Sequence, residues 1–224
     1  MHRRIDHLVL AARDLDAQAR LYERLGFQVG AANRHAWGTL NRIVQFDGCF
    51  LELLTTEDGF ERPSDDVPVA QFANPIADYL ATREGMAMLV LASKDAAADQ
   101  AEFAAKQIAG PTTFYFDRKG RKPDGTPVDV AFTLAFAKPK WAVKAGFFVC
   151  QQHVPEAFWN PAFQVHPNGV RSIAGVIFQA QDAAVAASFL SDFSGRDGTT
   201  PIPGGHRPTF DQPPRNAARP AQHS

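Results

Sequence analysis

The sequence predicts an α+β protein built from two β-α-β-β-β units, followed by a partial third unit. A short apolar run, a polar step and an aspartate that opens an Ala-rich amphipathic run recur at residues 5–14, 88–95 and 175–182. Internal repeats of this kind are stronger evidence about architecture than composition is. With 224 residues, 45% of them hydrophobic, the chain can also bury a sizeable core.

The first unit is predicted to span residues 1–56. Its opening strand over residues 5–10 leads to Asp14, a residue type that caps helices, and the helix that follows ends at Gly26 in the manner of a C-terminal glycine. Asp47-Gly48 is a hairpin turn signal. The other three strands of this unit are predicted over residues 27–29, 39–47 and 49–54.

Residues 57–85 are predicted to be a linker that closes with a short helix over residues 75–83. The second unit, residues 86–169, repeats the order of the first. It has a strand over residues 86–91, a helix capped by Asp95, and strands over residues 112–117, 128–136 and 146–152. The basic stretch 118–122 is interpreted as a solvated hairpin tip, with steering of an acidic ligand as the alternative.

The partial third unit, residues 170–195, is predicted to contain a strand over residues 173–179 and a helix that starts at Asp182. Residues 196–224 are rich in Pro, Gly, Arg and Gln and have almost no large apolar side chains. Such a segment cannot offset the entropy of ordering, so we predict a disordered tail.

Composition excludes several classes of partner. A formal net charge of -1 and a pI near 6.6 argue against a nucleic-acid or membrane-surface protein, because both need a basic excess on one face. The N-terminus has no signal-peptide pattern, so a cytoplasmic location is expected. Cys49 and Cys150 show no CxxC spacing and predict neither a disulfide framework nor a zinc knuckle. The expected partner is a small molecule, and the assembly stays open between a monomer and a homodimer.

The paired units resemble the vicinal oxygen chelate superfamily, which includes glyoxalase I, bleomycin-resistance proteins and extradiol dioxygenases, and most of all its glyoxalase-like domain proteins. Residues 5–10 and 50–53 open and close the first unit as in those families. Residues 34–42 are similar to their His-x-x-Gly-Thr-x-Asn pattern, and the regions 150–153 and 166–169 also resemble theirs. The resemblance covers residues 5–193 and implies the fold more specifically than the activity.

The resemblance implies that the two units form one cup-shaped sheet. It also implies a divalent metal held by side chains from the first and fourth strands of each unit. By position, His7 and Glu52 match the first-unit pair, whereas Met88 and Cys150 match the second-unit pair. Methionine is a soft, weak ligand, so this set departs from a regular four-ligand site. His153 is the expected third ligand, because imidazole binds metal without first losing a proton as the Cys150 thiol must. It can reach the cup only if its strand bends or bulges.

Each of these residues also has a purely structural interpretation. His7 shares a strand face with Ile5 and Val9 and could be a core histidine. Glu52 favours a site, because a carboxylate in an apolar strand is almost never buried unless it is paired or ligates a metal. The two side chains are therefore expected to meet, either as metal ligands or as an ion pair.

Ligand-binding residues are predicted in the segment that precedes and begins the third strand. His35 beside Trp37 either lines a pocket mouth or is exposed to solvent, and Asn41 either binds a carbonyl or carboxylate or lies on a wet face. The predicted function is a metal-assisted lyase, isomerase or dioxygenase of the glyoxalase-like type acting on a small carbonyl substrate. Its metal ligands are His7, Glu52 and His153, and Glu52 or His153 moves the proton. The alternative is a metal-free binding protein of the bleomycin-resistance type.

Overall fold

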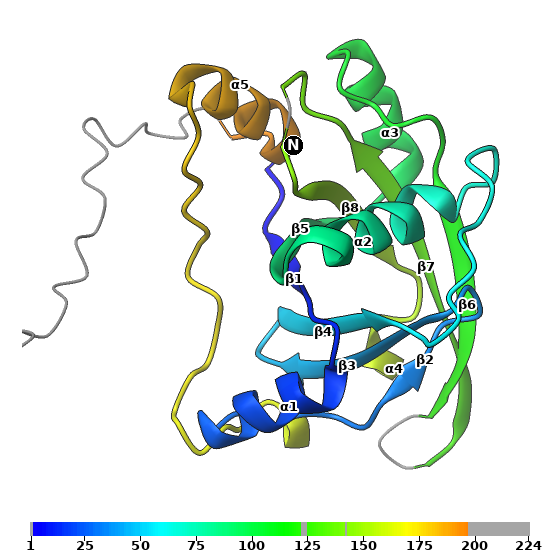
Figure 1. Ribbon diagram of the computed structural model, residues 1–224, viewed down its shortest axis with the longest axis vertical. Helices are drawn as coiled ribbons and strands as arrows, with labels where there is room; N and C mark the ends of the chain where they lie inside the picture. Colours follow the sequence, from blue (N-terminus) through cyan, green and yellow to red (C-terminus); the bar gives the residue numbers. More distant parts are fainter. Residues whose placement is uncertain (1, 122–124, 142, 197–224) are drawn as a thin grey trace, which may run out of the picture.

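One sheet, curled into a half-barrel, organises the chain in the computed structural model, which describes residues 2–121, 125–141 and 143–196 (Figure 1). Its eight strands within these ranges follow the order β2-β3-β4-β1-β5-β8-β7-β6. The first unit consists of β1 (Ile5–Ala11), α1 (Leu15–Arg24), β2 (Asn33–Arg34), β3 (Thr39–Gln45) and β4 (Phe50–Thr56). The second consists of β5 (Gly85–Ser93), α3 (Ala96–Ala105), β6 (Phe114–Arg121), β7 (Pro127–Ala137) and β8 (Gly146–Gln152). The remaining elements are α2 (Ala70–Thr82), α4 (Pro155–Phe158), the 3-10 helix Pro161–Phe163 and α5 (Ala183–Ser194).

The predicted α+β fold with two β-α-β-β-β units is confirmed. Within each unit the first strand pairs in parallel with the last, β1 with β4 and β5 with β8, and the units join where β1 and β5 pair antiparallel. All three predicted caps form: the side chains of Asp14, Asp95 and Asp182 accept hydrogen bonds from the first turns of α1, α3 and α5. Gly26 follows α1 at φ +83°, a backbone conformation that suits glycine.

Two predicted strands are wrong. Residues 27–29 do not pair with another strand. Phe27 packs inward on Phe46, and the backbone N–H of Gln28 donates to Nδ1 of His166. Residues 173–179 are extended but unpaired. They cross the outer side of the sheet, where Ile173 packs on the first unit and Phe178 on the second. The two edges of the sheet are β2 and β6. Residues 173–179 lie across the outer face and not along either edge, so they have no strand to pair with.

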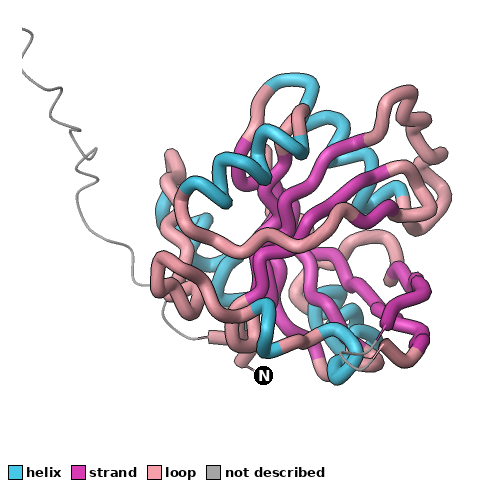
Figure 2. The backbone as a smooth tube through the Cα atoms, turned by 90° about the horizontal axis from the view of Figure 1, so that it is seen from below, coloured by secondary structure: helices cyan, strands magenta, loops and turns pink. Residues whose placement is uncertain are grey.

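The apolar side chains on the inner side of the cup form one cluster, and those on the outer side form separate clusters. Figure 2 shows the strands fanning through the middle of the molecule with helices around them. Helix α2 covers part of the concave side through Phe72, Ile76 and Leu80. Helix α1 packs on the outer side of the first unit, and α3 and α5 pack on the outer side of the second. A site inside the cup is therefore bounded by the inner side of the sheet and by the residues of α2 that pack on it.

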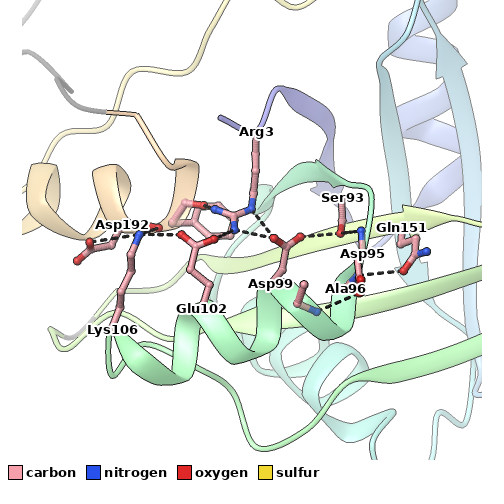
Figure 3. Close-up of polar contacts among 11 residues, drawn as sticks. Arg3, Ser93, Asp95, Ala96, Asp99, Glu102, Lys106, Gln151 and Asp192 are labelled. Atoms are coloured by element: carbon pink, nitrogen blue, oxygen red, sulfur yellow. Dashed lines mark hydrogen bonds and ion pairs between the residues drawn. The ribbon is translucent and has the colours of Figure 1, made fainter. Parts of the chain in front are cut away.

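A buried ionic network fixes the N-terminal residues to the outer helices (Figure 3). The Arg3 guanidinium donates to Asp99 Oδ1 from Nε at 3.0 Å and from Nη2 at 2.6 Å, and also donates to Glu102 Oε2 at 2.5 Å. Its Nη1 donates to the Phe193 carbonyl at 3.0 Å, which connects α5 to the same group. Asp99 in turn accepts from the Ser93 hydroxyl at 2.6 Å. Because the Arg3 side chain is 3% exposed, this network is part of the core.

No helix among the described residues is long and apolar enough to cross a membrane. The predicted disordered tail lies, from residue 197 onward, outside the described ranges.

Candidate functional site

A line of polar side chains crosses the otherwise apolar interior of the cup beside a cavity of about 50 Å³. His7 on β1, Asn41 on β3 and Glu52 on β4 belong to it, together with His35, which follows β2. The cavity is lined by His7, His35, Trp37, Asn41, Ile43, Phe50, Glu52, Phe72, Phe116, Arg118, Phe132, Leu134, Phe148, Cys150 and Phe158. The structure therefore brings together five of the six predicted site residues, namely His7, His35, Trp37, Asn41 and Glu52.

His7 is held between two carboxylates. Its Nδ1 lies 2.7 Å from Asp6 Oδ2, and its Nε2 lies 3.7 Å from Glu52 Oε2. Asp6 is adjacent in sequence and would ordinarily point to the opposite face, but the pairing of β1 with β5 is irregular between Ile5 and His7. Asp6 Oδ1 also accepts from the Gln152 amide at 3.0 Å. Asp6 thus orients the imidazole, a role that sequence analysis missed.

Glu52 is buried, with 6% of its surface exposed. The Asn41 amide donates to its Oε1 at 2.5 Å and lies 3.4 Å from His35 Nε2. Since 3.7 Å is too long for a hydrogen bond, Oε2 is not fully engaged by His7. Glu52 therefore has one oxygen fixed by the protein and one that a ligand could contact.

An outer groove of about 700 Å³ lies next to the cavity. Both are lined by His35, Trp37, Phe116 and Arg118. His35 stacks on Trp37 with ring centroids 4.5 Å apart, and Phe116 meets Trp37 edge-on at 5.0 Å. His35 was predicted either to line a pocket mouth or to be exposed to solvent. In the structure it is buried, and with Trp37 it lines both the cavity and the groove.

Arg118 was assigned to a solvated hairpin tip, and that interpretation is wrong. Strand β6 continues past it, and the alternation that puts Phe114 and Phe116 toward the cup puts Arg118 on the same side, opposite Val130. The side chain lines the cavity. The spacing of Phe114, Phe116 and Arg118 in steps of two was the sequence signal that could have revealed it.

His153 does not join the cup residues. It is exposed, and its Nε2 lies 2.7 Å from the hydroxyl of Thr133. Thr133 alternates with Phe132 and Leu134, which line the cavity, so Thr133 and His153 lie on the outer side of the sheet. Strand β8 pairs regularly with β7 up to Gln152, without the bulge that would turn His153 inward.

The strand register also changes the second-unit match to Glu52. The helix caps Asp14 and Asp95 align Val9 with Val90; Val9 pairs with Glu52, whereas Val90 pairs with Phe148. Phe148, and not Cys150, therefore occupies the equivalent position. Cys150 still lines the cavity, but burial raises the pKa of its thiol well above the ordinary value, and the charges of Asp6 and Glu52 raise it further.

The donor set does not fit a four-ligand metal site. His7 and Glu52 would serve as the first-unit donors, while the matching second-unit positions hold the thioether of Met88 and the phenyl ring of Phe148. Within the described ranges, no three His, Cys, Asp or Glu side chains are grouped so that they could hold a metal ion. The predicted set of His7, Glu52 and His153 is not assembled.

His35 is buried, with 8% of its surface exposed, and gives the site a pH dependence. Burial lowers the pKa of His35, the charge of Glu52 raises it, and the charge of Arg118 lowers it. The unfolded chain therefore takes up this proton first, near pH 6.5, and stability should fall as the pH drops below about 7.

In urea unfolding at pH 5 to 8, the free energy of unfolding of His35→Gln should vary less with pH than that of the wild type. The exposed His153→Gln is the control, and equal slopes for His35→Gln and wild type would contradict the assignment.

Comparison with known proteins gives a match along most of the chain. The model of the family described as glyoxalase-like domain matches residues 5–194. No curated protein matches. Among solved structures, a hypothetical protein from Staphylococcus aureus is 15% identical with a TM-score of 0.49; the match covers 67% of this chain and 59% of that one. A methylmalonyl-CoA epimerase from Mycobacterium tuberculosis is 17% identical with a TM-score of 0.44, covering 66% of this chain and 86% of that one. This chain thus spans less than two thirds of the Staphylococcus aureus protein.

Proposed function

Because the chain belongs to the glyoxalase-like domain family, of the vicinal oxygen chelate superfamily, we propose that it is an enzyme that moves a proton on a small oxygen-bearing substrate, with Glu52 as the proton acceptor and donor. The observation that carries this proposal is the buried Glu52 carboxylate, which has one oxygen held by Asn41 and the other beside His7 and the cavity. A carboxylate in such a position is seldom found without a partner or a function.

The surroundings of Glu52 suit general acid–base chemistry. Asn41 fixes the carboxylate, so that the free oxygen is presented in one orientation. The proton passes from the substrate carbon to the free oxygen of Glu52 and back to the carbon. His7, oriented by Asp6, lies beside that oxygen, where an N–H on Nε2 would stabilise the ionised carboxylate. The aromatic lining keeps bulk water away, which strengthens the interaction of these charges with a bound substrate.

Members of this superfamily include metal-dependent enzymes, but the proposed reaction does not include a metal step. His7 and Glu52 lack second-unit donors, because Met88 and Phe148 offer no suitable ligand atom. Proton transfer by side chains is the chemistry that this set of residues can perform by itself.

The test is hydrogen exchange at a carbon next to a carbonyl. Wild-type protein is incubated in D₂O with methylglyoxal, 2-oxobutyrate and phenylpyruvate, and exchange of their C–H protons is followed by NMR. We expect faster exchange for at least one compound, and a loss of about 100-fold or more in Glu52→Gln, in line with the usual contribution of a general base. The exposed Glu61→Gln should keep the wild-type rate.

Treatment with a chelator separates the two chemical routes. The wild-type rate should survive it. If the rate depends on added Zn²⁺, Mn²⁺, Ni²⁺ or Fe²⁺, the metal-assisted enzyme predicted from the sequence takes the place of the metal-free one, with His7 and Glu52 as its ligands.

A second function, metal-free binding without turnover, is favoured by one observation. The second-unit positions are apolar, and aromatic rings surround the cavity, as in a protein that sequesters an amphipathic ligand. Binding of these compounds with no exchange in the wild type would support it over the enzyme.

A further inference from the structure

Arg118 is a half-buried cation without a direct partner among residues 2–121, 125–141 and 143–196. Its guanidinium forms no hydrogen bond or ion pair with another residue of the described ranges. Burial lowers the pKa of Arg118, while the charge of Glu52 acts in the opposite direction. A guanidinium nevertheless stays protonated in proteins, so the cup carries a positive charge with unused donors.

Arg118 lies where the inner cavity meets the outer groove, since it lines both. The other arginine of the groove, Arg34, already pairs with Glu57 Oε2 at 2.7 Å. Asp117 also lines the groove but alternates with Arg118 along β6 and is exposed. Of the two arginines that line the groove, Arg118 is therefore the one that a ligand could bind without breaking an existing ion pair.

We propose that Arg118 binds the anionic oxygen head group of the substrate, a carboxylate or a phosphate, so that the substrate is a small organic acid. This inference rests on the proposed function and names its substrate class. Five donors in a planar fork match either head group. The cavity of about 50 Å³ admits only a compact group, while the groove of about 700 Å³ can hold a larger apolar body against Trp37, Phe114 and Phe116.

The placement of charge also orients such a substrate. Glu52 and Arg118 both line the inner cavity but form no ion pair. An acid anchored on Arg118 keeps its negative charge on the cationic side, and the neighbouring carbon can face Glu52. The competing interpretation is that Arg118 only offsets the charge of Glu52, in which case neutral and anionic ligands would respond alike to its removal.

The experiment measures binding of three probes to the full-length chain by calorimetry: phenylpyruvate, its neutral methyl ester and phenyl phosphate. We expect at least one acid to bind the wild type about 10-fold or more tightly than the ester, and Arg118→Gln to lose about 10- to 100-fold of that affinity while keeping the ester affinity. Lys119→Gln is the matched control, because Lys119 is exposed on the neighbouring position of β6 and should leave all affinities unchanged. Whether phenylpyruvate or phenyl phosphate binds more tightly identifies the head group.

Equal binding of acids and ester, no acid binding at millimolar concentration, or an equal loss for all probes in Arg118→Gln would overturn the proposal. The same titrations with Glu52→Gln separate it from the proposed function. If acid binding through Arg118 persists in a protein that shows no proton exchange, the anion site stands and the enzyme assignment fails.

Discussion

Replacing Asp99 by alanine should lower the free energy of unfolding by about 3 to 5 kcal/mol, the usual cost of removing one partner of a buried ion pair. Asp99 accepts two hydrogen bonds from Arg3 and one from Ser93, and the Arg3 side chain is 3% exposed. Without Asp99 the guanidinium keeps, among the described residues, only Glu102 and the Phe193 carbonyl as hydrogen-bond partners. The measurement is urea unfolding at pH 7 followed by circular dichroism.

The control for this prediction is an exposed ion pair of similar length. Asp16 accepts from Arg42 at 2.9 Å, and its side chain is 65% exposed, so Asp16→Ala should cost less than about 1 kcal/mol. The double variant Arg3→Met with Asp99→Leu should recover much of the lost stability, because it removes the buried charge as well as its partner. A cost for Asp99→Ala as small as that for Asp16→Ala would show that the network does not stabilise the core.

Short-range sequence patterns predicted the starts of the helices correctly, because interactions between residues close in sequence determine where a helix starts. Asp14, Asp95 and Asp182 cap their helices as predicted, since a cap depends on hydrogen bonds within a few residues. Residues 173–179 were misassigned because an extended apolar segment becomes a strand only if a sheet edge is free beside it. That information lies in the whole topology and not in the segment.

The sequence predicted the residues that the first unit contributes to the candidate site but missed the contribution of the second unit. His7 and Glu52 were found because a titratable side chain stood out in an apolar strand, and parallel pairing of β1 with β4 brings them together. Arg118 was missed because it opens a basic run, which resembles a solvated turn. His153 was misplaced because its side depends on whether β8 bulges, and a single sequence does not report a bulge.

The divergence of the two units also explains why the family resemblance overestimates the metal site. The structural equivalents of His7 and Glu52 are Met88 and Phe148, and both are core residues with 2% and 1% exposure. Met88 packs so closely on Gly146 that a side chain at that glycine would collide with it. The second unit therefore uses these two positions for packing, and at them only the first unit has polar side chains.

Adding one donor to the cup should create a zinc site with three protein ligands. Met88 pairs with Val9, the next cup-facing residue after His7, so a side chain at position 88 is a diagonal neighbour of His7 on the same face. Met88→His would give the cup two imidazoles and the Glu52 carboxylate, a donor set that binds zinc in proteins. Zn²⁺ at 100 times its dissociation constant should stabilise this variant by about 2.7 kcal/mol over its own metal-free form, and the same zinc concentration should leave the wild type unchanged.

Met86→His is the control, because Met86 packs on the outer side of the sheet and its replacement adds a histidine away from the cup. Unfolding of the three proteins with and without zinc decides the matter: stabilisation of the wild type would mean that His7 and Glu52 already bind metal, and no effect on Met88→His would mean that the two units are not aligned as the strand pairing indicates.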